Sequence, residues 1–261
     1  MIAIKNGQQL EAMRQACRIT AAARALAGEM VRPGVSTRSI DKAVHDFIVA
    51  QGAKPSFLGY HGFPASTCIS INATVIHGIP GGYILKEGDI VSVDVGAFYK
   101  GFHGDCAATF ACGTISAEAE KLIEVTKQSF YEGIRFATQG HRVSDISHAI
   151  ESYVESNGFS VVRSFVGHGV GRQLHEEPEV PNFDRPGRGP RLLKGMTLAI
   201  EPMVNTGVYD VRVLKDGWTT VTADGKLSAH DRDYRNSVLP APHGAVRQRR
   251  DLRRNAQLKN R

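Results

Sequence analysis

Four side chains that can bind a metal lie in apolar, glycine-containing segments of the sequence. They are Asp94 in DIVSVDVGAF, Asp105 in GFHGDCAATF, His168 in SFVGHGVGR and Glu201 in MTLAIEPMV. A single buried acid is usually a structural hydrogen-bonding group. Three acids and a histidine in strand-like surroundings need a shared compensating charge, which a divalent cation supplies. The four residues therefore predict a metal site.

The candidate ligands offer oxygen or imidazole nitrogen and include no cysteine. This donor set suits Mn, Fe, Co or Zn and does not choose among them. Several carboxylates allow bridging, and two metals roughly 3.5–4 Å apart can activate a water for hydrolysis. The pattern indicates a metal-dependent hydrolase.

Two further histidines stand beside the ligand segments. His77 lies in TVIHGIP, and His175 follows His168 by seven residues. Either histidine alone would more often be a packing residue. A histidine beside an activated water can polarise a carbonyl or donate a proton to a leaving amine. Their positions favour such a catalytic role for both.

An internal repeat predicts how the chain positions these residues. GVSTRSIDKAVHDFIVAQG begins at Gly34, and GHRVSDISHAIESYVESNG begins 106 residues later at Gly140, with apolar residues at helical spacing in both. A longer helix is expected before each copy and strands after it. Chance similarity could explain two helices, but the order of elements repeats as well. We expect helices over 7–30, 34–52, 117–139 and 140–158, and strands over 67–76, 90–98, 105–112, 160–166, 196–204 and 218–222.

Composition narrows the class of protein. The 261 residues contain no apolar run of the roughly 18 residues that a membrane helix needs, and the start lacks the pattern of a signal peptide. The four cysteines show no CxxC pair, which favours reduced thiols. We expect a cytoplasmic, monomeric protein.

The net charge of +6 is confined to the C-terminal end. The last 32 residues hold nine basic and three acidic residues, so the first 229 are neutral. The segment has little apolar content and no periodicity, which predicts a disordered basic tail over 232–261. RNA contact through it has no support from stacking aromatics, and no specific nucleic-acid partner is expected.

The motifs as a set resemble those of type I methionine aminopeptidases, the short bacterial form. The resemblance runs from the first residues to about Ala229 and includes YHGFPASTCISINATVIHGIP, GDIVSVDVGAFYKGFHGDCAATF, GHGVGRQLHEEPEVPNF and KGMTLAIEPMVN. It implies the pita-bread fold, an α/β (α+β) architecture with two pseudo-symmetric halves around a central antiparallel sheet. The halves would be 1–113 and 114–231 of one catalytic domain.

The resemblance also implies roles for individual residues. The four candidate ligands would hold two divalent metals (Co, Mn, Fe or Zn). His77 and His175 would contact substrate and stabilise the intermediate, and Glu201 would shuttle the proton. The implied pocket for the methionine side chain is soft and aromatic, which suits a thioether; it would use Tyr60, Phe63, Cys68 and Trp218.

One departure from the family pattern stands out. The family has a final glutamate ligand where this chain has Arg232 in LSAHDRDYRN. An arginine about 4 Å from a dication would be repelled by roughly 8 kcal/mol at an effective dielectric near 20, so we expect a weakly active or inactive chain. Codons CGA GAT TAC CGT from Arg232 would read Glu-Ile-Thr-Val after loss of the first base. This suggests a frameshift hypothesis that resequencing tests. Alternatively, Asp231 or Asp233 supplies the missing ligand.

Three functions follow from the sequence. The favoured one is removal of the initiator methionine from nascent chains with a small second residue, near the ribosome. A proline-specific peptidase or creatinase-like hydrolase of the same fold is the second. The third is a catalytically impaired module that binds protein or RNA, favoured by the missing glutamate.

Overall fold

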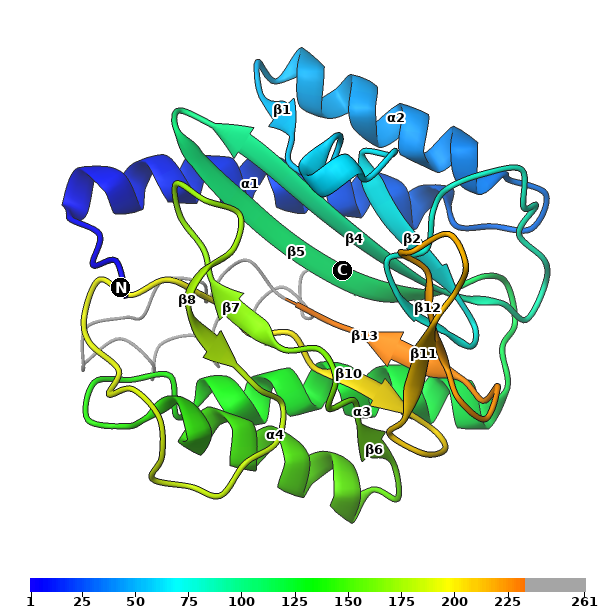
Figure 1. Cartoon of the computed structure of the whole chain (residues 1–261). Coiled ribbons are helices and arrows are strands. Elements are labelled where there is room, and N and C mark those ends of the chain that lie inside the picture. The colour runs from blue at the N-terminus through cyan, green and yellow to red at the C-terminus, as the bar shows by residue number, and fades with distance from the viewer. Residues whose placement is uncertain (233–261) are drawn as a thin grey trace, which may run out of the picture.

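The computed structural model describes residues 1–232, and two pairs of helices enclose its strands (Figure 1). α1 (Gly7–Met30) and α2 (Thr37–Ala50) cover the strands of the first half. α3 (Ala117–Ile134) and α4 (Val143–Ser156) cover those of the second half. A short 3-10 helix, η1, spans Tyr60–Gly62. None of the helices in the described range is long and apolar enough to cross a membrane.

Local sequence signals set the helix boundaries. At the start of α1 the Asn6 side chain accepts a hydrogen bond from the backbone N–H of Gln9, and the Gln9 side chain accepts one from the backbone N–H of Asn6. Together they form a capping box. Ser36 and Ser116 likewise cap α2 and α3 through their side chains. α2 buries Ile40, Val44 and Ile48 at four-residue spacing, so one apolar stripe faces the sheet.

The first half is organised around a long antiparallel hairpin. β4 (Ile90–Tyr99) pairs along its full length with β5 (Phe102–Ala111), and its other edge pairs with β1 (Lys54–Pro55) and β2 (Thr67–Ile71). α1 lies directly on this hairpin (Figure 1). The strand expected over 67–76 is broken, because Asn72 takes a left-handed conformation (φ 53°) before β3 (Thr74–Ile76) begins.

The second half contains shorter strands. β10 (Met203–Asn205) pairs with β6 (Ser160–Val161) and β13 (Ser228–His230). β7 (Gly167–Gly169) lies between β8 (Glu176–Val180) and β9 (Leu198–Ala199). β12 (Thr220–Thr222) joins β11 (Val211–Val213) to β3 of the first half.

The repeat predicted from the sequence is present in the structure. α2 and α4 both have 14 residues, and they begin 106 positions apart at Thr37 and Val143. β1 and β6 follow at the same offset, and each pairs antiparallel with a strand of its own half. The predicted pita-bread arrangement of two related halves is confirmed.

A short backbone pairing beside the four candidate ligands links β5 of the first half to the segment that follows β13. Ala107 of β5 and Arg232 exchange both backbone hydrogen bonds, at 3.0 and 2.9 Å. The Thr109 hydroxyl donates to the His230 carbonyl and accepts from its amide, both at 2.9 Å. Arg24 donates through Nη1 to the carbonyls of Ala107 (3.0 Å) and Arg232 (3.1 Å). We call this pairing the seam.

The seam changes one boundary expected from the sequence. The predicted basic tail begins at Arg232, yet this residue is 2% exposed and paired with Ala107. Charge composition assigns Arg232 to the exposed tail because an arginine is rarely buried unless it is paired with acids. The rest of the predicted tail, 233–261, lies outside the described residues. The frameshift hypothesis concerns mostly these residues.

Candidate metal centre and substrate pocket

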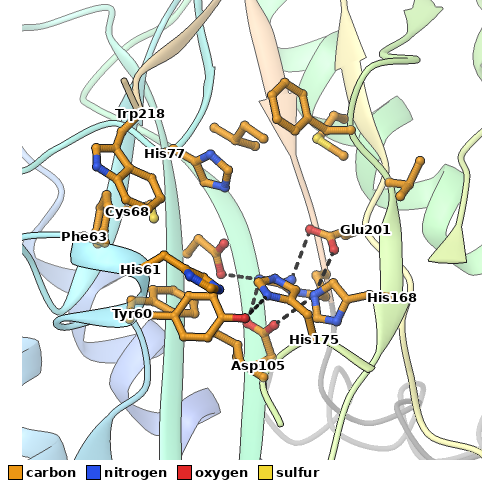
Figure 2. Close-up of a pocket in the computed structure, with 18 residues that line it drawn as sticks. Tyr60, His61, Phe63, Cys68, His77, Asp105, His168, His175, Glu201 and Trp218 are labelled. Carbon is orange, nitrogen blue, oxygen red and sulfur yellow. Dashed lines mark hydrogen bonds and ion pairs between the residues drawn. The ribbon is translucent and has the colours of Figure 1, made fainter. Parts of the chain in front are cut away.

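The four candidate ligands lie at the edge of one cavity between the halves. Asp94 and Asp105 lie on the adjacent strands β4 and β5; Asp94 is opposite Ala107, two residues from Asp105. His168 lies in β7, and Glu201 lies between β9 and β10. Figure 2 shows Asp105, His168 and Glu201 turned toward one another. The structure brings together all four residues selected from the sequence.

The repeat relates two of these acids. Phe98 is paired with Lys54 in the first half, and Asn205 is paired with Ser160 in the second. Asp94 stands four residues before Phe98, and Glu201 stands four residues before Asn205. Each half therefore contributes one carboxylate from the corresponding position.

The orientation of His168 is fixed by its backbone contact. Nδ1 lies 2.8 Å from the carbonyl oxygen of Gly169, to which only a protonated nitrogen can donate. Nε2 lies 3.6 Å from Asp105 Oδ2 and 3.4 Å from Glu201 Oε1. Burial lowers the pKa of His168, which favours the neutral ring. Its Nε2 lone pair thus faces two carboxylates, an arrangement that requires a cation.

That cation is the guanidinium of Arg232. Nη2 contacts Asp94 Oδ1 and lies 2.7 Å from Asp105 Oδ1, while Nη1 lies 3.1 Å from Glu201 Oε2. The arginine side chain is 2% exposed, so its charge is desolvated and compensated by these acids. The sequence indicated that Arg232 stands at a ligand position; the structure shows that its side chain enters the cluster.

The pKa values of the acids reflect this arrangement. Burial raises the pKa of Glu201, but Arg232 and His230 more than offset it and bring the pKa to about 2. Burial also raises the pKa of Asp105, and there it outweighs the charge of Arg232, so the pKa stays well above its usual range. Glu201 is therefore the more readily ionised of the two.

The guanidinium does not satisfy the cluster completely. Arg232 Nε has no hydrogen-bond partner within residues 1–232, and Asp105 Oδ1 lies close to Nη2 without hydrogen-bond geometry. His230 Nε2 is 3.3 Å from Glu201 Oε2, also without that geometry. Buried polar groups without partners are uncommon in native proteins. The cluster accommodates the arginine imperfectly.

A divalent metal does not fit the cluster in this conformation. Oxygen and imidazole donors are the right types, but the guanidinium lies among the carboxylate oxygens that a metal would use. Over the described part of the chain, no group of three or more His, Cys, Asp or Glu side chains has a geometry ready for a metal. Asp231 is not among the residues of 1–232 that line the cavity, and Asp233 lies outside them.

An apolar pocket opens beside the acids. The cavity has a volume of about 490 Å³. Phe63 and Trp218 pack edge to face with ring centroids 5.2 Å apart, and Cys68 belongs to the same cluster of side chains (Figure 2). Leu174 is buried in the same cluster. All four residues that the resemblance placed in the methionine pocket line this cavity: Tyr60, Phe63, Cys68 and Trp218.

The two additional histidines also line the cavity. His175 Nδ1 lies 2.7 Å from the Tyr60 hydroxyl, and its ring packs against His168 at 4.2 Å between centroids. His77 packs edge to face against Trp218 at 6.2 Å and has a positive φ of 57°. Burial lowers both pKa values, that of His175 to about 4, so both rings are neutral near pH 7.

Sequence reasoning missed two histidines of the site. His61 lines the cavity from η1 with a φ of 47°, and His230 is buried at the end of β13 beside Glu201. A positive φ at a histidine leaves no pattern in a single sequence. The sequence gives only a weak indication of His230: it stands two residues before Arg232, in a strand of three residues that is too short to show a pattern.

Known proteins similar to this chain match it over both of its halves. The family model described as Metallopeptidase family M24 matches residues 11–247. The methionine aminopeptidase of Clostridium perfringens is 58% identical over 244 residues, covering 94% of this chain and 97% of that protein. Methionine aminopeptidase 1 of Bacillus subtilis is 51% identical over 230 residues, covering 88% and 93%. The crystal structure of methionine aminopeptidase from Thermotoga maritima matches with a TM-score of 0.88 at 44% identity, covering 89% of this chain and 94% of that one.

Proposed function

Since the chain belongs to metallopeptidase family M24 and is similar to methionine aminopeptidases over nearly its whole length, we propose that it removes the N-terminal methionine from newly made proteins. The restriction to a small second residue follows from the resemblance of its motifs to type I enzymes. As a member of a metallopeptidase family, it belongs to a class whose chemistry uses a divalent metal.

The observation that carries the proposal is an apolar pocket directly beside an acidic cluster. Phe63, Cys68 and Trp218 form a soft, aromatic wall, and a thioether makes favourable contacts with such a surface. The acids outnumber the single guanidinium, so the field at the other side of the cavity favours a cationic amino terminus. A free N-terminal methionine matches both sides.

The neutral histidines are suited to handle the peptide bond. Tyr60 orients His175 through a 2.7 Å hydrogen bond, and a neutral imidazole can donate one hydrogen bond to a developing oxyanion. His77 lies across the cavity from Glu201 (Figure 2), where it can hold the departing amine. Glu201, whose Oε1 lies 3.4 Å from His168 Nε2 at the edge of the cavity, is our candidate to accept and return a proton.

We assign Asp94, Asp105, His168 and Glu201 as the residues that bind metal. Their donor types permit two divalent cations of the Mn, Fe, Co or Zn class. Because the guanidinium lies among the same oxygens, we route no catalytic step through a metal here.

The test is methionine release from Met-Ala-Ser with enzyme in excess and Mn²⁺ or Co²⁺ present. We expect slow release by the wild type, none from an X-Pro peptide, and none by Asp105→Ala or His168→Ala. Circular dichroism checks that both variants keep the fold. Release by either variant removes that residue from the assigned site. Cleavage of the X-Pro peptide instead refutes methionine specificity. Equal inactivity of wild type and variants, with methionine still bound, favours the binding module.

A further inference from the structure

Arg232 connects acids from both halves of the chain. Its guanidinium contacts Asp94 and Asp105 of the first half and lies 3.1 Å from Glu201 of the second. These are the oxygens that the proposed function assigns to a metal. We propose that Arg232 is an internal counter-ion that competes with divalent metal for this cluster, so that a metal binds only after the guanidinium has left. The inference rests on that metal assignment.

The competition follows from charge and space. The cluster is buried, so the repulsion between a guanidinium and a dication within contact distance is only weakly screened. Both cations need the same oxygens of Asp94, Asp105 and Glu201, so they cannot be accommodated together. Occupation by one excludes the other.

The backbone of Arg232 is fixed, and only its side chain is free to exchange. Ala107 pairs with both backbone groups of Arg232, and Arg24 donates to the carbonyls of both residues. The seam therefore keeps the backbone of the arginine beside the cluster. Its side chain also lines the cavity, which gives the guanidinium space to turn into.

Incomplete satisfaction makes the guanidinium displaceable. Arg232 Nε has no hydrogen-bond partner among the described residues, and Asp105 Oδ1 is contacted at 2.7 Å without hydrogen-bond geometry. A guanidinium in a matching site would use its forked geometry and leave fewer groups unpaired. Metal at sufficient concentration should therefore replace it, with weakened affinity.

The experiment measures Mn²⁺ binding by calorimetry and by electron paramagnetic resonance of free Mn²⁺. Loss of a group that only orients ligands typically changes affinity 10–100-fold, so removal of a competing charge should matter at least as much. We expect Arg232→Met to bind Mn²⁺ roughly 100-fold more tightly than the wild type. The matched control is Arg163→Met, which removes an arginine that pairs with Glu151 and stacks on Tyr209 away from the cluster. It should bind Mn²⁺ like the wild type.

Two further measurements keep the proposal open to refutation. Mn²⁺ should raise the melting temperature of Arg232→Met more than that of the wild type. If Arg232→Met does not fold, Arg232→Lys retains a positive charge with fewer donors and should show a smaller gain of roughly tenfold. Equal affinity in wild type and folded variants overturns the competition and leaves the metal assignment intact. Failure of all of them to bind millimolar Mn²⁺ overturns the metal assignment itself, and the competition with it.

Discussion

Replacing Gly104 by alanine should disturb the packing of α1 on the hairpin that holds both aspartates. A Cβ at Gly104 would lie 2.6 Å from the Cys17 nitrogen and from the Ala16 carbonyl carbon. Ordinary contact begins at 3.4 Å, so the helix must retreat by about 0.8 Å. The atoms it meets are backbone of a long helix, which has no rotamer to change.

The size of the effect follows from this geometry. Overpacking a tight interface destabilises a protein by about 1–3 kcal/mol, and a rigid neighbour places Gly104→Ala near the upper value. For a folded body of this size, each kcal/mol lowers the melting temperature by roughly 2–4 °C. We therefore expect a drop of roughly 6–12 °C, measured by calorimetry or circular dichroism.

The matched control is a glycine of α1, the helix that Gly104 contacts. A Cβ added at Gly7, the first residue of α1, would meet no atom within 4 Å, so Gly7→Ala should be neutral or slightly stabilising. A Gly104→Ala protein that melts within about a degree of the wild type would refute the direct contact between α1 and β5, because a change of about 1 kcal/mol already gives 2–4 °C.

Three other predictions concern separate parts of the molecule. Glu176→Gln removes the negative charge that lies 2.6 Å from the buried Lys5 ammonium and should destabilise the fold by roughly 2–3 kcal/mol at pH 7. Burial raises the pKa of Glu176, but the hydrogen bond from Lys5 gives a net lowering. The stabilisation by the pair is therefore present above pH about 4.3 and is lost as pH falls through the folded-state pKa. Urea titrations of wild type and Glu176→Gln should show a smaller difference in unfolding free energy at pH 3.5 than at pH 7, and an equal difference at both pH values contradicts the prediction. Burial raises the pKa of the Cys17 thiol to about 12, and Cys106 and Cys112 are buried as well, so a thiol reagent should react with none of these three until the chain unfolds. The single tryptophan, Trp218, lies in the pocket wall, so its fluorescence should change saturably with methionine and not with lysine; equal responses would place methionine elsewhere.

The parts of the fold that the sequence predicts are those with regular periodicity. Ile40, Val44 and Ile48 recur at helical spacing, and the second copy at an offset of 106 has the same pattern, so both helices and the two-half arrangement are predictable. β7 and β11 have three residues each, too few for alternation to show. Their existence depends on long-range pairing, which no local pattern records.

The candidate site divides in the same way. Asp94 and Glu201 are conspicuous in the sequence because a carboxylate is costly to bury in an apolar segment. For Arg232, the sequence shows only that a basic residue stands where the family resemblance predicts a metal ligand, and that a metal there would repel it. It does not show that the backbone at Ala107 holds this arginine inside the cluster, which requires the three-dimensional pairing of residues far apart in the chain.

The seam also has a consequence for the order in which the protein is completed during synthesis. Asp94 and Arg232 are 138 positions apart, and the backbone partner of Arg232 lies in β5. A chain emerging from its amino terminus can form the β4–β5 hairpin early, but Asp94 and Asp105 then stand without the charge that Arg232 contributes. Because a carboxylate pair without a counter-charge resists burial, the first half should keep this end of its sheet hydrated until the segment with Arg232 arrives. Closure of the cluster therefore follows formation of the hairpin in folding and waits for translation of Arg232, 138 positions after Asp94.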